Sequence, residues 1–111
     1  MKRGEVWTVA GASDYAGKPR PVVILQDDRF DSTASVTICP LTTSSIDAPL
    51  LRVIIQPSAQ NGLRVPSHLM ADKITTVART KLGRRIGTLD PIEMAVLGRA
   101  LILFLRLTQT R

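Results

Sequence analysis

One arginine of this sequence is held between two prolines at the start of a strongly apolar stretch. Arg20 has a proline on each side, and residues 22–25 read Val-Val-Ile-Leu. Each proline fixes its own φ and pushes the preceding residue toward an extended conformation, so Arg20 has little backbone freedom. A guanidinium always carries charge and presents five donors, which suits a phosphate better than proton abstraction. Pairing with Asp14 or Asp27 is the structural alternative, and the local sequence leaves both roles open.

Two threonines, the only histidine and the only cysteine complete the set of candidate chemical groups. Thr42 and Thr43 end a strand-like stretch, where a hydroxyl can donate to a phosphate oxygen. His68 is the only histidine, which excludes a ribonuclease that works with two, and its position is more typical of a structural residue. Cys39 reads as a small buried apolar residue, and a single cysteine fits a reducing cytoplasm.

Several standard sites are not supported by the residue types. Neither His68 nor Cys39 has a carboxylate pair at helical spacing nearby, so we expect no metal site. The glycines near residues 11 and 17 lack a following Lys-Ser/Thr helix start, which a phosphate loop requires. No nucleophile elbow is present either. The residue types therefore leave Arg20 and the two threonines as the candidate chemical groups.

The net charge of +6 is unevenly distributed along the 111 residues. Basic and acidic residues balance up to residue 55, whereas nine basic residues stand against three acidic ones beyond it. Five cations and no acid lie between residues 73 and 85. This asymmetry favours a polyanionic partner, with nucleic acid as the first candidate. A solvated face on an alkaline protein would give the same pattern.

The remaining pattern predicts a single domain, residues 1–111, that is rich in strands. Strand-like stretches are residues 6–10, 22–26, 36–41, 50–56, 72–80 and 84–90. Asp90, Pro91 and Glu93 have the spacing of an N-cap, a first helical position and a capping box, so a helix is expected over residues 92–107. We therefore expect a mainly β fold with five to seven short strands, closed as a small barrel, and one C-terminal helix.

The expected C-terminal helix is almost wholly apolar apart from Arg99 and Arg106, which lie on one side. One small sheet cannot cover so much apolar surface, so the helix predicts a subunit interface. Phe104 and, in the first strand, Trp7 are expected in the core. No uncharged stretch approaches the roughly twenty residues needed to span a bilayer, and no membrane association is expected.

Four blocks of the sequence resemble the MazF/PemK family of toxin endoribonucleases. They are KRGEVWTV at residues 2–9, GKPRPVVIL at 17–25, ICPLTT at 38–43 and HLMADKITTVARTKLGRRIGTLDPIEM at 68–94. The blocks stand in the family's order and spacing and cover nearly the whole chain. The resemblance implies an SH3-like barrel with a C-terminal helix, a homodimer in the cytoplasm, and a cognate antitoxin with an acidic, partly disordered tail.

The same resemblance implies a sequence-specific endoribonuclease of the mRNA interferase type that needs no metal or cofactor. In that reaction the ribose 2′-hydroxyl of single-stranded RNA attacks the adjacent phosphate and leaves 2′,3′-cyclic phosphate and 5′-hydroxyl ends. The family's catalytic arginine and threonine fall on Arg20 and Thr42, and its loop acid is matched by Asp14. The group that removes the 2′-proton stays open among Asp14, His68 and water.

The residues expected to bind RNA are cations, a hydroxyl and one aromatic ring. They are Lys18, Tyr15, Thr43, Lys73, Arg79, Lys81, Arg84 and Arg85. Tyr15 offers a ring for base stacking, and the basic residues could track either RNA or the antitoxin's acidic tail. Lys73 stands where many family members have glutamine, which leaves the base specificity open. Two alternatives remain: a non-catalytic toxin of the same fold that poisons DNA gyrase, and a family member that binds without cutting.

Overall fold

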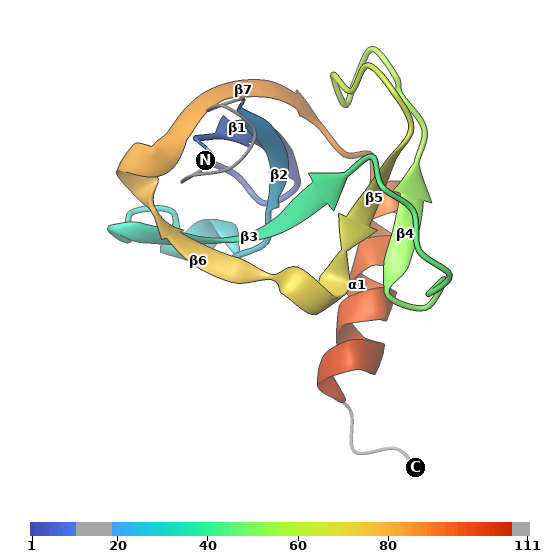
Figure 1. Cartoon of the computed structure of the whole chain (residues 1–111). Helices are drawn as coiled ribbons and strands as arrows, with labels where there is room; N and C mark the ends of the chain where they lie inside the picture. The colour runs from blue at the N-terminus through green and yellow to red at the C-terminus, as the bar shows by residue number, and fades with distance from the viewer. Residues whose placement is uncertain (11–18, 108–111) are drawn as a thin grey trace.

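A computed structural model describes residues 1–10 and 19–107 of the chain. Figure 1 shows a curved β-sheet with one helix beside it. The strands are β1 (Glu5–Val9), β2 (Arg20–Ile24), β3 (Ser35–Thr42), β4 (Arg52–Ile55), β5 (Ser67–Met70), β6 (Thr75–Ala78) and β7 (Leu82–Thr88). The helices are the 3-10 turns η2 (Asp28–Phe30), η3 (Ala71–Lys73) and η4 (Arg79–Lys81) and the α-helix α1 (Pro91–Leu105). The mainly β class, the seven strands and the C-terminal helix confirm the sequence prediction.

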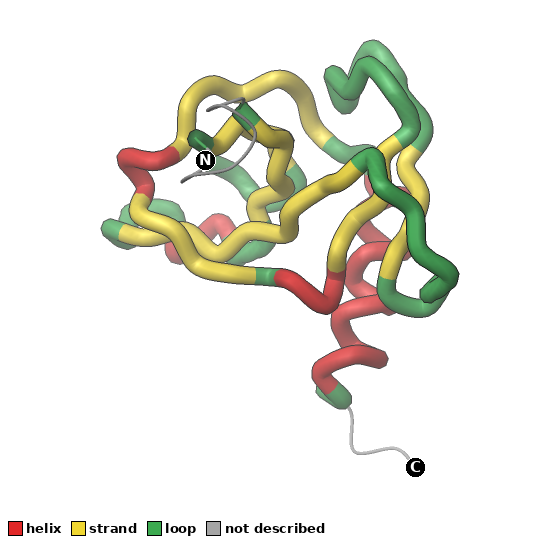
Figure 2. The backbone as a smooth tube through the Cα atoms, in the orientation of Figure 1, coloured by secondary structure: helices red, strands yellow, loops and turns green. Residues whose placement is uncertain are grey.

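The strands are antiparallel and follow the order β4-β5-β3-β2-β1-β7. The first half of β3 pairs with β6, and its last two residues pair with β5, so β3 connects these two strands. Within residues 1–10 and 19–107, this order ends at β4 and at β7, β6 is joined to it only through β3, and the strands curve round without closing (Figure 2). The expected closed barrel is thus corrected to a strongly curved open sheet. The reason is local: the turn η4 separates β6 from β7. As a result β6 pairs with β3, β7 pairs with β1, and the two strands do not pair with each other.

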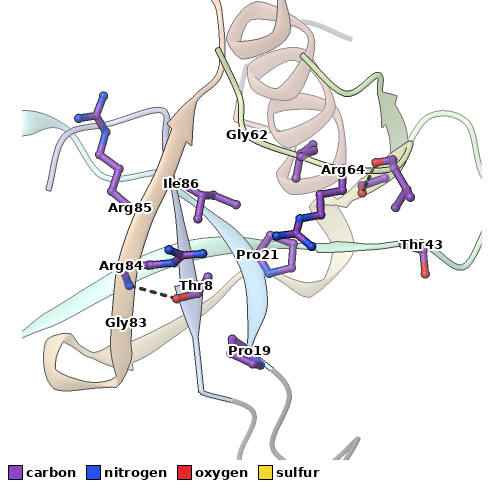
Figure 3. A pocket seen from close by; sticks show the side chains of 13 residues that line it. Thr8, Pro19, Pro21, Thr43, Gly62, Arg64, Gly83, Arg84, Arg85 and Ile86 are labelled. Atoms are coloured by element: carbon purple, nitrogen blue, oxygen red, sulfur yellow. Dashed lines mark hydrogen bonds between the residues drawn. The ribbon is translucent and has the colours of Figure 1, made fainter. Parts of the chain in front are cut away.

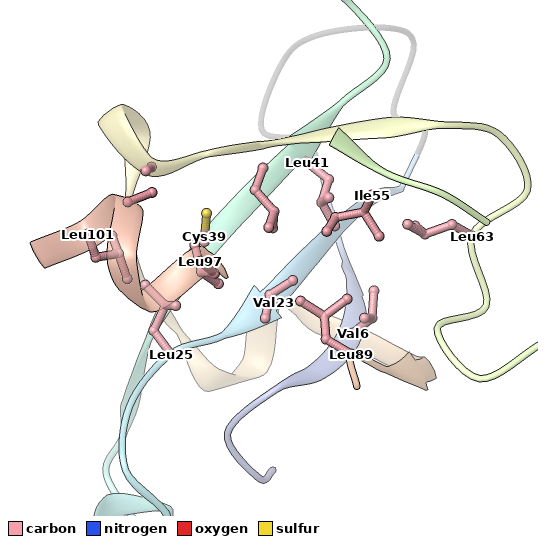
Figure 4. Packing of buried hydrophobic residues seen from close by; sticks show 13 residues of the cluster. Val6, Val23, Leu25, Cys39, Leu41, Ile55, Leu63, Leu89, Leu97 and Leu101 are labelled. Carbon is pink, nitrogen blue, oxygen red and sulfur yellow. The ribbon is translucent and has the colours of Figure 1, made fainter. Parts of the chain in front are cut away.

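The sheet is buried on both faces at its centre. Val22 and Ile24 of β2 belong to one apolar cluster, whereas Val23 between them belongs to a second cluster on the other face. This explains why the β2 sequence shows no alternation of polar and apolar residues. Figure 4 shows the larger cluster, in which Cys39 lies beside Leu97 of α1. Burial raises the pKa of the Cys39 thiol to about 12, so the expectation of a buried, inert cysteine holds.

Helix α1 begins with the expected capping box. The Asp90 carboxylate accepts a hydrogen bond from the Glu93 amide at 2.7 Å, and the Glu93 carboxylate accepts one from the Asp90 amide at 2.8 Å. The helix ends at Leu105, two residues before the predicted end, because Arg106 adopts a left-handed conformation with φ of +53°. This reversal stops the helical hydrogen bonding although the apolar sequence continues.

Much of the apolar surface of α1 is not covered within one chain. The last turns of the helix extend beyond the sheet in Figure 1. The exposed large apolar side chains of this region are Ile92, Val96, Ile102, Leu103, Phe104, Leu105 and Leu107. Phe104 was expected in the core but is 43% exposed, because it lies past the edge of the sheet that would have covered it. Trp7 is half-buried against the second cluster, as expected. None of the described helices is long and apolar enough to cross a membrane.

Candidate functional site

Arg20 and Thr42 lie at the same end of two paired strands. Arg20 is the first residue of β2 and Thr42 is the last residue of β3. The register pairs Val22 with Pro40, and continuing it by two residues puts Arg20 opposite Thr42. Both residues line a pocket of about 300 Å³, which we call the Arg20–Thr42 pocket. The structure thus brings together the two described residues to which the resemblance assigned the chemistry.

The backbone at this pocket is positioned by the two prolines and by pairing with β1. Pro21 pairs with Thr8, and Arg20 pairs with Val9, so the start of β2 is held between β1 and β3. Across the pocket, the Thr42 hydroxyl oxygen accepts a hydrogen bond from the Ser44 amide at 3.2 Å. That bond uses an oxygen lone pair and leaves the hydroxyl proton to donate elsewhere, which is what binding of a phosphate oxygen requires.

A larger pocket of about 980 Å³ adjoins the first one. Pro19, Pro21, Thr43 and Ser67 line both. Figure 3 shows the guanidinium groups of Arg64 and Arg84 directed toward Pro21 from different strands and loops. We call this larger hollow the arginine pocket. Two cations that converge beside the Arg20–Thr42 pocket form a surface suited to a polyanion that continues past one bound phosphate.

Arg64 was not among the residues predicted to bind RNA, and its loop is built by a buried asparagine. The Asn61 side-chain oxygen accepts hydrogen bonds from the Ser58 and Leu63 amides, both at 3.0 Å, and its side-chain nitrogen donates to the Gln56 carbonyl at 2.9 Å. Gly62 has φ of +73°, and a side chain there would overlap the backbone of β7. The Asn-Gly turn signal marked this loop, but a turn signal does not show where the next side chain points.

The adjacent arginines of β7 have different surroundings. The Arg84 amide donates to the Thr8 hydroxyl at 3.1 Å, and its guanidinium turns into the arginine pocket (Figure 3). Arg85 also lines that pocket, but its guanidinium is directed away from Pro21 in Figure 3, and its Nε lies 3.5 Å from a carboxylate oxygen of Glu5. Burial raises the pKa of Glu5, but hydrogen bonds from Trp7 and the Lys2 amide and the charge of Arg85 together lower it below its usual value. Arg85 thus has a structural partner, whereas Arg84 faces the hollow.

The remaining predicted RNA-binding residues are spread over the molecule. Lys73 in η3 and Lys81 in η4 are exposed and line neither pocket. Arg79 donates from Nε to the Thr33 carbonyl at 2.7 Å, so it links η4 to the turn before β3. Thr43 is exposed and lines both pockets. Asp14, Tyr15 and Lys18 lie outside the described residues.

Two further groups near the site were considered in the sequence. His68 of β5 lies opposite Thr42 of β3, and its Nδ1 is buried without a hydrogen-bond partner among the described residues. Asp27, an alternative partner for Arg20, accepts a hydrogen bond from the Arg29 side chain at 3.0 Å. In the described part of the chain, no group of three or more His, Cys, Asp or Glu side chains is placed to hold a metal ion.

Comparison with known proteins gives one consistent family. Residues 2–105 match the model of the PemK-like, MazF-like toxins of type II toxin–antitoxin systems. The chain is 54% identical to a probable endoribonuclease MazF of Mycolicibacterium smegmatis over 95% of its length and 96% of the relative's. It is 31% identical to endoribonuclease MazF9 of Mycobacterium tuberculosis over 96% of its length and 98% of the relative's.

Solved structures agree with these sequence matches. A mycobacterial endoribonuclease in complex with its cognate antitoxin superposes with a TM-score of 0.79 at 28% identity, covering 99% of both chains. The curved sheet and the position of its C-terminal helix are therefore shared with that protein. With a family model that matches nearly its whole length, the chain belongs to the PemK-like, MazF-like toxins of type II toxin–antitoxin systems.

Proposed function

We propose that this chain is an endoribonuclease toxin that cleaves single-stranded RNA at short sequence motifs without a metal ion. The observation that carries the proposal is the placement of Arg20 opposite Thr42 in one pocket, beside the converging Arg64 and Arg84. Two relatives that match nearly the full chain are named endoribonucleases, which supports the same activity.

The proposed reaction uses the 2′-hydroxyl of RNA as its nucleophile. The 2′-oxygen attacks the adjacent phosphorus, and the bond from phosphorus to the 5′-oxygen breaks, which leaves 2′,3′-cyclic phosphate and 5′-hydroxyl ends. The protein then needs only to position the phosphate, stabilise its added charge and move protons. Arg20 binds the equatorial oxygens of the phosphorane, and Thr42 donates its hydroxyl proton to one of them.

The arginine pocket carries the RNA strand on either side of the cleaved phosphate. Arg64 and Arg84 come from a loop and a strand that converge beside the Arg20–Thr42 pocket, so adjacent backbone phosphates can reach both cations. An acidic antitoxin tail is also an extended polyanion. We therefore propose that the tail and the RNA compete for this pocket, and that inhibition follows from the competition.

The exposed apolar side of α1 is proposed to be covered by a second copy of the chain. Val96 and Leu103 lie seven residues apart on one side of the helix and are 39% and 53% exposed. Arg99 lies between them, so the contact would have a polar element within an apolar one. A homodimer through α1 removes this apolar area from water. The arginines of the two pockets lie on other elements, with Arg20 on β2, Arg84 on β7 and Arg64 in the loop before β5.

The test is incubation of the purified protein with a long single-stranded RNA in excess EDTA, followed by mapping of the new ends. Wild type should cut at a short recurrent motif and leave 5′-hydroxyl ends, and Arg20→Ala should lose at least about a hundredfold in rate. Arg20→Lys is the matched control, because it keeps the charge but loses the planar donors. A folded wild type that cuts none of a diverse set of RNAs would overturn the proposal and make gyrase poisoning the next function to test.

A further inference from the structure

Four residues form a floor that the two pockets share. Pro19, Pro21, Thr43 and Ser67 line both the Arg20–Thr42 pocket and the arginine pocket. The two prolines stand two residues apart along extended chain, so their rings face the same side of the sheet. The register of β3 with β5, continued by one residue, sets Thr43 opposite Ser67. This shared floor thus consists of two pyrrolidine rings beside two hydroxyl groups.

The hydroxyl of Ser67 can only accept a hydrogen bond from a ligand. The residue is 3% exposed, and its Oγ donates to the Val65 carbonyl at 3.0 Å. A hydroxyl has one proton, so this bond leaves only lone pairs on the oxygen. Within residues 1–10 and 19–107, no group donates a hydrogen bond to that oxygen. Thr43 is exposed, and its hydroxyl can rotate to donate or to accept, so the selective group of the shared floor is Ser67.

The ligand group that fits Ser67 is a hydrogen-bond donor and not a phosphate oxygen, which only accepts. The Val65 carbonyl lies 3.0 Å from Ser67 Oγ, so two acceptors stand side by side. An amino group carries two protons, one for each acceptor. The ring N–H of uracil lies between two carbonyl oxygens, one of which would be brought against these acceptors. The pair therefore fits the exocyclic amino group of adenine, cytosine or guanine.

The prolines and the arginines supply the two surfaces between which such a base can lie. Among the described residues, no aromatic side chain lines either pocket. Figure 3 shows the guanidinium groups of Arg64 and Arg84 directed toward Pro21. A guanidinium stacks on a base by its face and binds a phosphate by the N–H groups at its edge. A base between Pro21 and one of these planes can therefore direct its amino group to Ser67.

We propose that Ser67 determines base specificity by accepting a hydrogen bond from the exocyclic amino group of a base next to the scissile phosphate. This inference rests on the endoribonuclease function proposed above. The pocket proposed to bind the phosphate and the hollow that takes the base share one floor, so the phosphate and an adjoining base are positioned together. Uracil is the one RNA base without an exocyclic amino group, and it is disfavoured at this position.

The first test changes the RNA and needs no variant of the protein. In an RNA with one mapped cleavage site, each amino-bearing base close to the scissile phosphate is replaced in turn by its amine-free counterpart. These are purine for adenine, 2-pyrimidinone for cytosine and hypoxanthine for guanine. At one position the replacement should lower kcat/KM about 10- to 100-fold, because a buried acceptor is left without a donor. A cleavage motif that accepts uracil at every one of these positions would overturn the proposal.

Ser67→Ala tests whether this serine is the group that reads the amine. In the variant, the amino-bearing RNA and its amine-free counterpart should be cut with kcat/KM values within about threefold of each other. A merely structural role of Ser67 would lower both values equally and keep their ratio. Ser35→Ala is the matched control, because Ser35 is exposed on β3 and lines neither pocket, and it should keep the wild-type ratio. A folded Ser67→Ala that keeps the full discrimination would overturn the proposal.

A binding measurement separates this inference from the endoribonuclease function. The probes are short uridine oligonucleotides that carry one adenine, cytosine or guanine, each compared with its amine-free counterpart. Wild type should bind at least one amino-bearing probe about tenfold more tightly, and Ser67→Ala should bind both members of that pair equally. A wild type that shows this preference but cuts no RNA would overturn the endoribonuclease function alone. A wild type that cuts RNA without any preference for the amine would overturn the role of Ser67 alone.

Discussion

Arg52 and Asp72 form a two-bond ion pair that ties β4 to η3. Arg52 Nε lies 2.7 Å from one oxygen of the Asp72 carboxylate, and Nη2 lies 3.1 Å from the other. The two side chains are only 8% and 23% exposed. Hydrogen bonding by Arg52 holds the pKa of Asp72 below its usual value, and the same bonds raise the pKa of Arg52. The pair fixes η3 to β4, the strand that pairs with β5.

Asp72→Asn should lower the free energy of unfolding by about 1–3 kcal/mol at pH 7, because the largely buried Arg52 loses its charged partner. A depressed carboxyl pKa stabilises the fold above the unfolded-state value of about 4, and this stabilisation is lost as pH falls through the folded-state pKa. The difference between wild type and variant should therefore be full above pH 5 and shrink below pH 4. Urea unfolding at several pH values measures it.

The exposed pair of Lys2 and Asp31 provides the control for this prediction. The two side chains are 59% and 39% exposed, with the atoms 3.4 Å apart. Exposed ion pairs contribute little, so Asp31→Asn should leave the urea midpoint unchanged. An Asp72→Asn variant as stable as Asp31→Asn at pH 7 would show that the Arg52 pair does not hold η3 in place.

Arg64→Ala and Arg84→Ala should each weaken the binding of a non-cleavable RNA. Both guanidinium groups face the arginine pocket, so each removal should also reduce the slope of log affinity against log salt by about 0.7. Arg29→Ala is the matched control, because Arg29 is an exposed cation that lines neither pocket and pairs with Asp27. Titration at several salt concentrations checks this, and an Arg29→Ala defect equal to that of Arg84→Ala would contradict the assigned RNA path.

Val96→Glu combined with Leu103→Glu should convert the proposed homodimer into monomers. Two carboxylates on the uncovered side of α1 would repel their copies and could not be desolvated in an apolar contact. Sedimentation velocity measures the change, with Ser35→Glu on an exposed position of β3 as the control. Dimers that persist in the double variant would place the interface elsewhere.

Cys39 should not react with a thiol reagent at pH 8 while the protein is folded. The side chain is fully buried, and burial raises the pKa of its thiol to about 12, so almost no thiolate forms. One thiol per chain should react after denaturation in guanidinium chloride. Fast reaction in the native state, measured by absorbance of the released chromophore, would contradict the packing of β3.

The elements that the sequence predicted well are those set by local rules. The capping box at Asp90 fixes the start of α1 from three neighbouring residues, and the prolines around Arg20 define the start of β2. The end of α1 was misjudged because a left-handed turn at Arg106 leaves no sign in an apolar sequence. Phe104 was placed in the core because composition does not show how far a sheet extends beneath a helix.

The sequence pointed to the two residues of the Arg20–Thr42 pocket but not to the cations that surround it. Arg20 and Thr42 could be named from motifs, and strand pairing brings them together. The position of Arg64 depends on a loop folded around buried Asn61, and the contrast between Arg84 and Arg85 depends on contacts with distant Thr8 and Glu5. The five cations between residues 73 and 85 are close in sequence but spread out in space, because the chain turns at η3 and η4 within that segment.

The most direct test of the central claim uses two RNAs that differ by one oxygen atom. One carries the mapped cleavage site, and the other has a single 2′-deoxy nucleotide on the 5′ side of the scissile phosphate. If the 2′-hydroxyl is the nucleophile, wild type should bind both with similar affinity and cut only the first, in EDTA. Cleavage of the 2′-deoxy RNA at the same position would show that water or a protein group attacks, and would contradict the roles assigned to Arg20 and Thr42.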